Sequence, residues 1–387
     1  MTEAEGILIQ LTANVICDKP TSFNELSDET LKEVYKIAKR HDMSHYIGAA
    51  LSKKEIKVSD AAFQHYQNVM LSTVARMRRI SYELERASEA LEKAEIQFIP
   101  LKGAVVRNFY PEFWMRTSCD IDILVHEEEF EKAIEAINSD GRFTIGEMHP
   151  HSRDVSLYAA GINIELHFNI IDYKDNLDAV LKDVWEYAVP REKYKYLMGL
   201  TPEYQLFHIY AHAANHFIEG GCGIKPLIDI FLLEKSLKYN GELFGQLLER
   251  SSLTRFREGL KALSNVWFAN ADHSALTLSM EKYIFSGGVY GSKINSMLVR
   301  GTKRAPERYV LNRIFMPYEF ISIKYPILRK HKYLTPVFEV VRWISFIFKG
   351  NYEERAEEVR TFNAVADGDK RQIDQMLKNL GLREEKK

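Results

Sequence analysis

Two aspartates in an apolar run are the residues of this chain best suited to chemistry. Asp120 and Asp122 lie in the segment Cys119–Val125, where Ile121 and Ile123 follow each of them. Side chains alternate along a strand, so both carboxylates are expected on one face and the isoleucines on the other. Neighbouring carboxylates repel each other unless a cation lies between them. The pair therefore predicts a divalent-metal site, and Mg²⁺ in such a site is typically completed by waters and substrate phosphates.

A third carboxylate occurs in a later apolar run. In Ile162–Phe168, Glu165 and His167 alternate with apolar residues and therefore share a face. If this segment lies beside the aspartate strand, Glu165 joins the same cluster. Three acids with two ions about 3.5–4 Å apart can activate a hydroxyl and stabilise the leaving oxygen of an in-line displacement. With Mg²⁺ or Mn²⁺ as the ion, the predicted ligands and catalytic residues are Asp120, Asp122 and Glu165.

Three histidines recur every four residues further along the chain. His208, His212 and His216 fall on one face of the helix expected over Gln205–Phe217. They are interpreted first as structural or substrate-facing polar residues, then as nucleotide or acceptor contacts, and lastly as metal ligands. We hypothesise that His212 and His216 line a cleft. The cluster Gly220–Gly223 that follows is read as a connection between helices, with a phosphate-binding loop as the alternative.

The elements that must position these residues change in character along the chain. Residues 1–95 show helical spacing, with helices expected over Thr30–Arg40 and over Ala61–Lys93. Helical spacing returns at Thr201-Pro202-Glu203 and dominates afterwards. Between them, short strand and helix candidates alternate, and the last strands are expected to pair antiparallel through a tight turn. The strand candidates are Gln97–Leu101, Cys119–Val125, Arg142–Glu147, Val155–Ala159 and Ile162–Phe168.

The predicted fold class is therefore α+β. A small mixed sheet with helices packed on it forms a core, and a large, mostly α-helical portion accompanies it. We expect an N-terminal helical region over residues 1–95, the α/β core over 96–195 and a C-terminal helical domain over 196–387.

Composition excludes several classes of protein. The chain has 387 residues, and 52 basic residues nearly balance 54 acidic ones, which makes long nucleic acid an unfavoured partner. Its three cysteines are far apart, and no secretory signal is evident, so a cytoplasmic location is expected. The most apolar stretch, Val337–Phe348, contains Glu339 and Arg342 and is too short to span a membrane. It is expected to be a buried helix, with an interfacial helix beside the basic segment Arg329-Lys330-His331-Lys332 as the less favoured alternative.

Several short motifs together carry a resemblance to a known family. Leu101-Lys102-Gly103 is followed by Tyr110-Pro111, by Arg116 shortly before Asp120–Val125, and by Glu165–His167. This pattern resembles the polymerase-β nucleotidyltransferase superfamily, and more closely its branch of uncharacterised nucleotidyltransferases. The likeness is strong over residues 97–170 and weaker after Thr201. One departure is that the superfamily turn usually reads Gly-Ser or Gly-Gly, whereas here Ala104 follows Gly103.

The resemblance implies metal-dependent transfer of a nucleoside monophosphate from a nucleoside triphosphate (NTP) to a hydroxyl, with release of pyrophosphate. The acceptor is expected to be a small molecule or a protein. Two alternatives stay open: an inactive binding protein with this fold, and a phosphohydrolase built on the three histidines and Asp229. The resemblance also assigns six residues to substrate or phosphate binding: Lys102, Gly103, Arg116, His167, His212 and His216.

Overall fold

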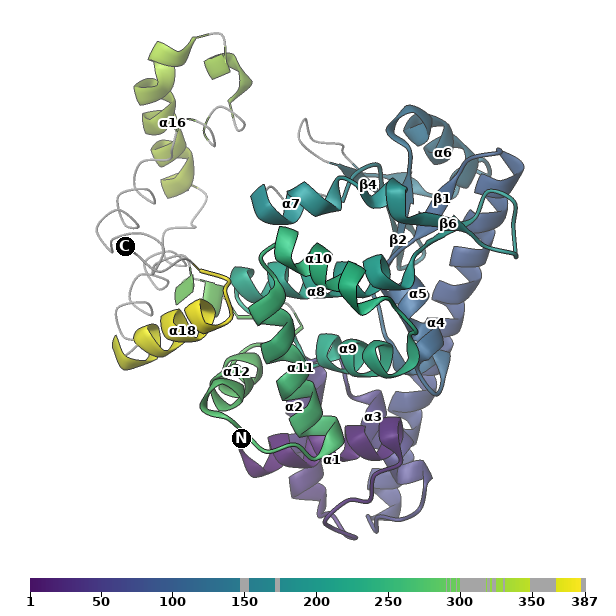
Figure 1. The fold of residues 1–387 in the computed structure, drawn as a ribbon, viewed down its shortest axis with the longest axis vertical. Helices are drawn as coiled ribbons and strands as arrows, with labels where there is room; N and C mark the ends of the chain where they lie inside the picture. The colour runs from purple at the N-terminus through teal and green to yellow at the C-terminus, as the bar shows by residue number, and fades with distance from the viewer. Residues whose placement is uncertain are drawn as a thin grey trace.

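A computed structural model describes residues 1–146, 153–170, 175–289, 331–348 and 367–383, with short pieces between 291 and 329. A five-stranded mixed sheet lies at one end of the long helix α4, and helical layers fill the rest of the molecule (Figure 1). The predicted α+β class is confirmed. The five strands are β1 (Phe98–Pro100), β2 (Asp120–Val125), β3 (Thr144–Ile145), β4 (Asp154–Ala159) and β5 (Ile162–His167).

The sheet has the order β1-β2-β5-β4-β3. Strands β2 and β5 are parallel neighbours, whereas every other adjacent pair is antiparallel. The expected tight turn joins β4 to β5. Its two central residues, Ala160 and Gly161, both adopt positive φ, at 46° and 78°. Two positive φ values at the centre of a two-residue connection match the twist of the strands that it joins. The third predicted strand shrinks to two residues in β3.

Alternation along β2 and β5 divides their residues between two apolar cores. Ile121 and Ile123 of β2 and Ile164 and Leu166 of β5 pack in one core with α4 and with α6, which runs from Phe130 to Ile137. The opposite face of β2 carries the two aspartates and then Leu124, which belongs to the larger, helical core. The acidic face of the sheet is therefore the one that looks toward the helical part of the molecule.

The helices that precede the sheet pack with those that follow it. Buried residues from residues 7–66 and from residues 177–285 form a single apolar core. The N-terminal helices are α1 (Glu3–Cys17), α2 (Asp28–Arg40), α3 (His45–Ser52) and α4 (Asp60–Lys93). The later helices are α7 (Asp175–Leu181), α8 (Pro202–Glu219), α9 (Lys225–Ser236), α10 (Gly241–Arg250), α11 (Thr254–Ala269), α12 (Ala275–Phe285), α16 (Thr335–Phe348) and α18 (Asp367–Asn379).

Short elements complete the chain. The hairpin β6–β7 runs beside β1, where Phe98 pairs with Leu197. The remaining elements are α5 (Gly103–Val106), β6 (Ala188–Pro190), β7 (Met198–Leu200) and the 3₁₀ turns η1 (Arg107–Phe109), η2 (Phe113–Met115), η3 (Glu127–Glu129), η4 (Val184–Tyr187), η5 (Pro326–Arg329) and η6 (Lys332–Leu334).

Local capping explains why the main helices begin where the sequence predicts. The Ser59 hydroxyl accepts a hydrogen bond from the Ala62 amide at the start of α4, and Thr201 does the same for Tyr204 at the start of α8. One expectation is wrong in the described part of α16, because Val337, Val340 and Val341 are exposed rather than buried. Within the described segments, no helix combines the length and apolarity needed to cross a membrane.

Close contact between α3 and α4 depends on a glycine. A Cβ added at Gly48 would lie 2.3 Å from the Tyr66 carbonyl oxygen and 2.9 Å from Met70 Cβ. We predict that Gly48→Ala lowers the free energy of unfolding by about 2–3 kcal/mol in chemical denaturation, because the helices must separate. Gly245→Ala in α10 is the control, since nothing lies within 4 Å of its Cβ position. That change should raise stability by about 0.5–1 kcal/mol through helix propensity alone, and equal losses in both variants would contradict the prediction.

Candidate active site

The structure brings the predicted carboxylates of β2 and β5 together. In the parallel register, Asp122 lies opposite Glu165, so their side chains leave the same face of the sheet. The Oδ1 atom of Asp122 accepts hydrogen bonds from Lys102 Nζ at 2.8 Å and from His167 Nε2 at 3.0 Å. His167 Nε2 also lies 3.8 Å from Glu165 Oε2. Asp122 is therefore the centre of the cluster.

Among the described residues, one group of three potential metal ligands has its atoms within 4.8 Å of one another. It consists of Asp122, Glu165 and His167. Asp120 lies outside this tightest group, although it lines the same cavity. The His167 nitrogen already donates to Asp122, as residues that orient a ligating carboxylate commonly do.

Charge balance in the cluster favours a divalent cation. Three carboxylates face a single ammonium, that of Lys102. Burial and the charge of Asp122 raise the pKa of Asp120, and burial together with both aspartates raises the pKa of Glu165. At Asp122 burial acts in the same direction, but Lys102 and His167 prevail and hold its pKa below the usual value. The oxygen-rich donor set and this excess of negative charge fit Mg²⁺ or Mn²⁺.

The turn after β1 places Lys102 in a sparsely populated conformation. Its φ is 48° and its ψ is −122°, a region that costs a non-glycine residue of order 1–3 kcal/mol. The amides of Val105 and Val106 bond to the Lys102 carbonyl and hold the turn. Burial acts to lower the pKa of the ammonium, but the charge of Asp122 and the hydrogen bond to it prevail and raise it. Strain of this kind often marks a functional position.

A cavity of about 900 Å³ opens between the carboxylate face and the helices. One wall carries Asp120, Asp122 and Glu165 together with Lys102, Gly103 and Ser118. His167, predicted to bind substrate, lies behind Asp122 and does not belong to this lining. The facing wall is formed by α8, the loop before α9 and residues 286–289 and 291–292. It includes His212, His216, Cys222, Gly223 and Lys225. The glycine cluster after α8 connects two helices, as the favoured interpretation has it, and its last two residues line this cavity.

The three histidines of α8 fall into two environments. His212 and His216 line the cavity, and their Nε2 atoms are 3.1 Å apart. His208 is buried, and burial together with the charge of Lys102 lowers its pKa to about 3. No metal-binding group that combines these histidines with Asp229 is found in the described segments of the chain. The geometry thus gives the phosphohydrolase alternative no support.

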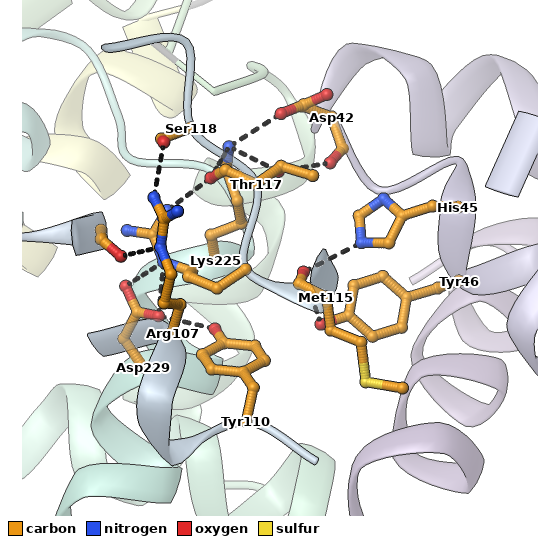
Figure 2. Close-up of polar contacts among 12 residues, drawn as sticks. Asp42, His45, Tyr46, Arg107, Tyr110, Met115, Thr117, Ser118, Lys225 and Asp229 are labelled. Atoms are coloured by element: carbon orange, nitrogen blue, oxygen red, sulfur yellow. Dashed lines mark hydrogen bonds and ion pairs between the residues drawn. The ribbon is translucent and has the colours of Figure 1, made fainter. Parts of the chain in front are cut away.

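Arg116 does not neutralise the aspartate pair directly. Its Nε atom donates to both oxygens of Asp229 in α9, at 2.7 and 3.0 Å, and its Nη1 atom donates to the Thr117 carbonyl at 2.6 Å. The Tyr110 hydroxyl adds a third contact to Asp229 at 2.6 Å (Figure 2). The guanidinium lines the cavity but has its counter-ion in the helical part.

Side chains from several helices hold the segment that leads into β2 (Figure 2). His45 Nε2 and the Tyr46 hydroxyl of α3 donate to the Met115 carbonyl at 2.9 and 3.2 Å. Lys225 of α9 contacts both oxygens of Thr117, at 3.3 and 3.4 Å. Arg107 Nη2 donates to Ser118 Oγ at 3.3 Å. Helices that precede β2 in the chain and a helix that follows it therefore both hold the start of this strand in place.

Asp42 is a site residue that sequence reasoning missed. Its carboxylate pairs with Lys225 at 3.0 Å and with Arg76 at 3.2 Å, and it lines the cavity. Burial acts to raise the pKa of Asp42, but Lys225, Thr117 and Arg76 prevail and lower it to about 2. At Lys225, in contrast, burial outweighs Asp42 and lowers the pKa of the ammonium.

This carboxylate predicts a pH-dependent stability. The folded-state pKa lies below the unfolded value of about 3.9, so the stabilisation is present above about pH 4 and is lost as the pH falls toward 2. The contribution is of order 2 kcal/mol. In acid unfolding titrations, Asp42→Asn should flatten the loss of stability between about pH 4 and pH 2 relative to wild type. If the free energy of unfolding depends on pH equally in the variant and in wild type over this range, Asp42 does not supply the pH-dependent stabilisation.

Comparison with known proteins agrees with the site. Residues 27–269 match the family described as "Uncharacterised nucleotidyltransferase". This match covers more than half of the chain, and the chain belongs to that family. No curated protein shows significant similarity. A solution structure of the antibiotic-resistance factor ANT(2'')-Ia aligns with 47% of this chain and 94% of its own, at 12% identity and a TM-score of 0.34. A likeness that weak says nothing about the substrate of this chain.

Proposed function

We propose that this protein is a metal-dependent nucleotidyltransferase that moves a nucleoside monophosphate from an NTP to a hydroxyl of a small molecule or a protein, with release of pyrophosphate. The observation that carries the proposal is the register of β2 against β5, which sets Glu165 beside Asp122 on the face that borders the cavity. Family membership supports the same class of reaction. The three free cysteines suit a reducing cytoplasm.

Asp120, Asp122 and Glu165 are the proposed metal ligands and catalytic residues. A bound Mg²⁺ or Mn²⁺ supplies positive charge to the phosphates and lowers the pKa of the attacking hydroxyl. His167 keeps Asp122 oriented through its hydrogen bond. Lys102, whose ammonium lies 2.8 Å from Asp122 on the wall of the cavity, would be the residue that contacts a phosphate oxygen as a point charge.

The turn between β1 and α5 is the proposed place for the triphosphate. Gly103 lets the chain pass close to Ser118, because an added Cβ would lie 3.3 Å from Ser118 Cβ. The Ser118 hydroxyl lines the cavity beside this turn. It offers a phosphate the small polar contact that Ala104 lacks. Arg116 lies on the same wall and contributes positive charge, although Asp229 offsets it.

The acceptor is proposed to occupy the part of the cavity that the helices line. His212 and His216 belong to that wall. A cavity of about 900 Å³ between two walls suits a small molecule or a single side chain better than a nucleic-acid duplex. The near balance of acidic and basic residues agrees with this choice.

Pyrophosphate release tests the reaction. The protein is incubated with Mn²⁺ and each of the four NTPs, together with small hydroxyl compounds and proteins as acceptors, and pyrophosphate is measured. Release that depends on both metal and acceptor, and that Glu165→Gln removes, is expected. Binding of Mn²⁺ and NTP without release for any acceptor favours the inactive binding protein, which the Gly103-Ala104 turn keeps as the second candidate.

A further inference from the structure

Two histidines on the wall proposed for the acceptor have no chemical role yet in the transfer of the nucleotide. His212 and His216 lie one turn apart on α8, and their rings meet edge to face with centroids 4.5 Å apart. Their Nε2 atoms approach to 3.1 Å. Residues around them on α8, such as Ala211, Ala213 and Phe217, are buried, so the helix is anchored on its other faces and the pair is held in this arrangement.

The separation of the two nitrogens has two physical explanations. A proton shared between them gives a distance near 3 Å. A common metal ion gives a similar distance. Two nitrogens about 2.0–2.1 Å from one ion lie about 2.9 Å apart at a right angle and about 3.4 Å apart at the tetrahedral angle. The observed 3.1 Å falls within this interval. The separation of the two nitrogens is therefore compatible with one shared ion.

The cavity gives an ion access to the histidine pair. Both histidines border a cavity that is open to solvent, so an ion can enter and water or a substrate can complete its coordination. The charged residues that line this cavity are five acids and four bases, so their charges nearly balance: Asp42, Asp120, Asp122, Glu165 and Asp229 against Arg40, Lys102, Arg116 and Lys225. Burial and the positive charge of Lys102 lower the pKa of His212, which keeps its ring in the neutral form that binds metals.

We propose that His212 and His216 form a second metal site in this cavity, selective for a transition ion such as Zn²⁺ or Co²⁺. Imidazole nitrogen prefers these ions, whereas the carboxylate cluster prefers Mg²⁺ or Mn²⁺. The two sites can then be filled independently. An ion at the histidine pair has open coordination positions on the wall where the acceptor is proposed to bind, so it can orient an acceptor hydroxyl there.

Co²⁺ titration in a large excess of Mg²⁺ tests this site, because Mg²⁺ occupies the carboxylates and Co²⁺ bound to nitrogen absorbs visible light. The full-length wild-type protein is expected to bind a single equivalent of Co²⁺. His212→Asn and His216→Asn should each weaken this binding at least about tenfold. His65→Asn, which changes an exposed histidine on α4, should leave it unchanged. Thermal melts of each variant check that it is folded.

Two further arms make the result decisive. Asp122→Asn should retain Co²⁺ binding, since that residue belongs to the other site. In the wild-type protein, electron spin echo modulation of bound Cu²⁺ should reveal two imidazole rings, a result that needs no variant to fold. Absence of Co²⁺ binding, or equal affinity in wild type and both histidine variants, would mean that the pair shares only a proton. Neither outcome bears on nucleotidyl transfer at the carboxylates.

Discussion

Asp122→Asn is expected to abolish the rise in melting temperature that Mn²⁺ and an NTP produce in the wild-type protein. Asp122 is the residue on which Lys102 and His167 converge, and it is only 3% exposed. Ligand at about 100 times its dissociation constant stabilises a protein by about 2.7 kcal/mol. For a chain of 387 residues that corresponds to a shift of roughly 3 °C. Asp120→Asn should remove most of the same shift.

The measurement compares each variant with and without Mn²⁺ and NTP by differential scanning fluorimetry. Changes in the stability of the ligand-free protein then cancel, which matters because Asn also relieves repulsion between the carboxylates. Asp272→Asn, in an exposed loop, is the matched control and should keep the full shift. A full shift in Asp122→Asn would exclude that carboxylate from the ligand set.

Asp229→Ala is expected to have the largest effect on stability. Asp229 is 2% exposed and accepts hydrogen bonds from Arg116 and Tyr110. Its removal leaves a buried guanidinium without a counter-ion, a situation that costs about 3–5 kcal/mol. Denaturant unfolding should show a loss of that size. Because Arg116 borders the segment that enters β2, the Mn²⁺ and NTP shift should also weaken.

A second substitution separates loss of charge from loss of packing. Arg116→Leu combined with Asp229→Leu removes both charges and should recover part of the stability that Asp229→Ala loses, since a buried ion pair can be replaced by apolar residues. A loss below about 1 kcal/mol in Asp229→Ala would mean that Arg116 finds another partner or reaches solvent.

Local sequence was sufficient for the elements and for the faces of the key strands. Alternation in Cys119–Val125 and in Ile162–Phe168 assigned the carboxylates to one side of each strand, and the structure has them there. The sequence does not show that these two strands are neighbours. The prediction of a shared cluster assumes it. Parallel pairing of β2 with β5 joins residues about 40 positions apart, and no local pattern specifies such a partner.

The rest of the site depends on contacts between distant parts of the chain. Arg116 has two aspartates within six residues, yet it pairs with Asp229, 113 positions away. The pair formed by Lys225 and Asp42 spans 183 positions. Spacing along a helix or strand cannot reveal such pairs, because they arise only when the turn between α2 and α3, the segment before β2 and helix α9 meet in the fold. For the same reason, no local pattern indicated that Thr117 and Ser118 would line the cavity.

Anomalous diffraction at the manganese edge tests the central claim most directly. Crystals are soaked with Mn²⁺ and a non-hydrolysable NTP. We expect an anomalous peak between Asp122 and Glu165, within coordination distance of both carboxylates and of a phosphate oxygen, with Lys102 Nζ moved away from Asp122. A triphosphate bound in the cavity with its metal elsewhere, and with the contact between Lys102 and Asp122 intact, would contradict the assignment of these carboxylates to catalysis.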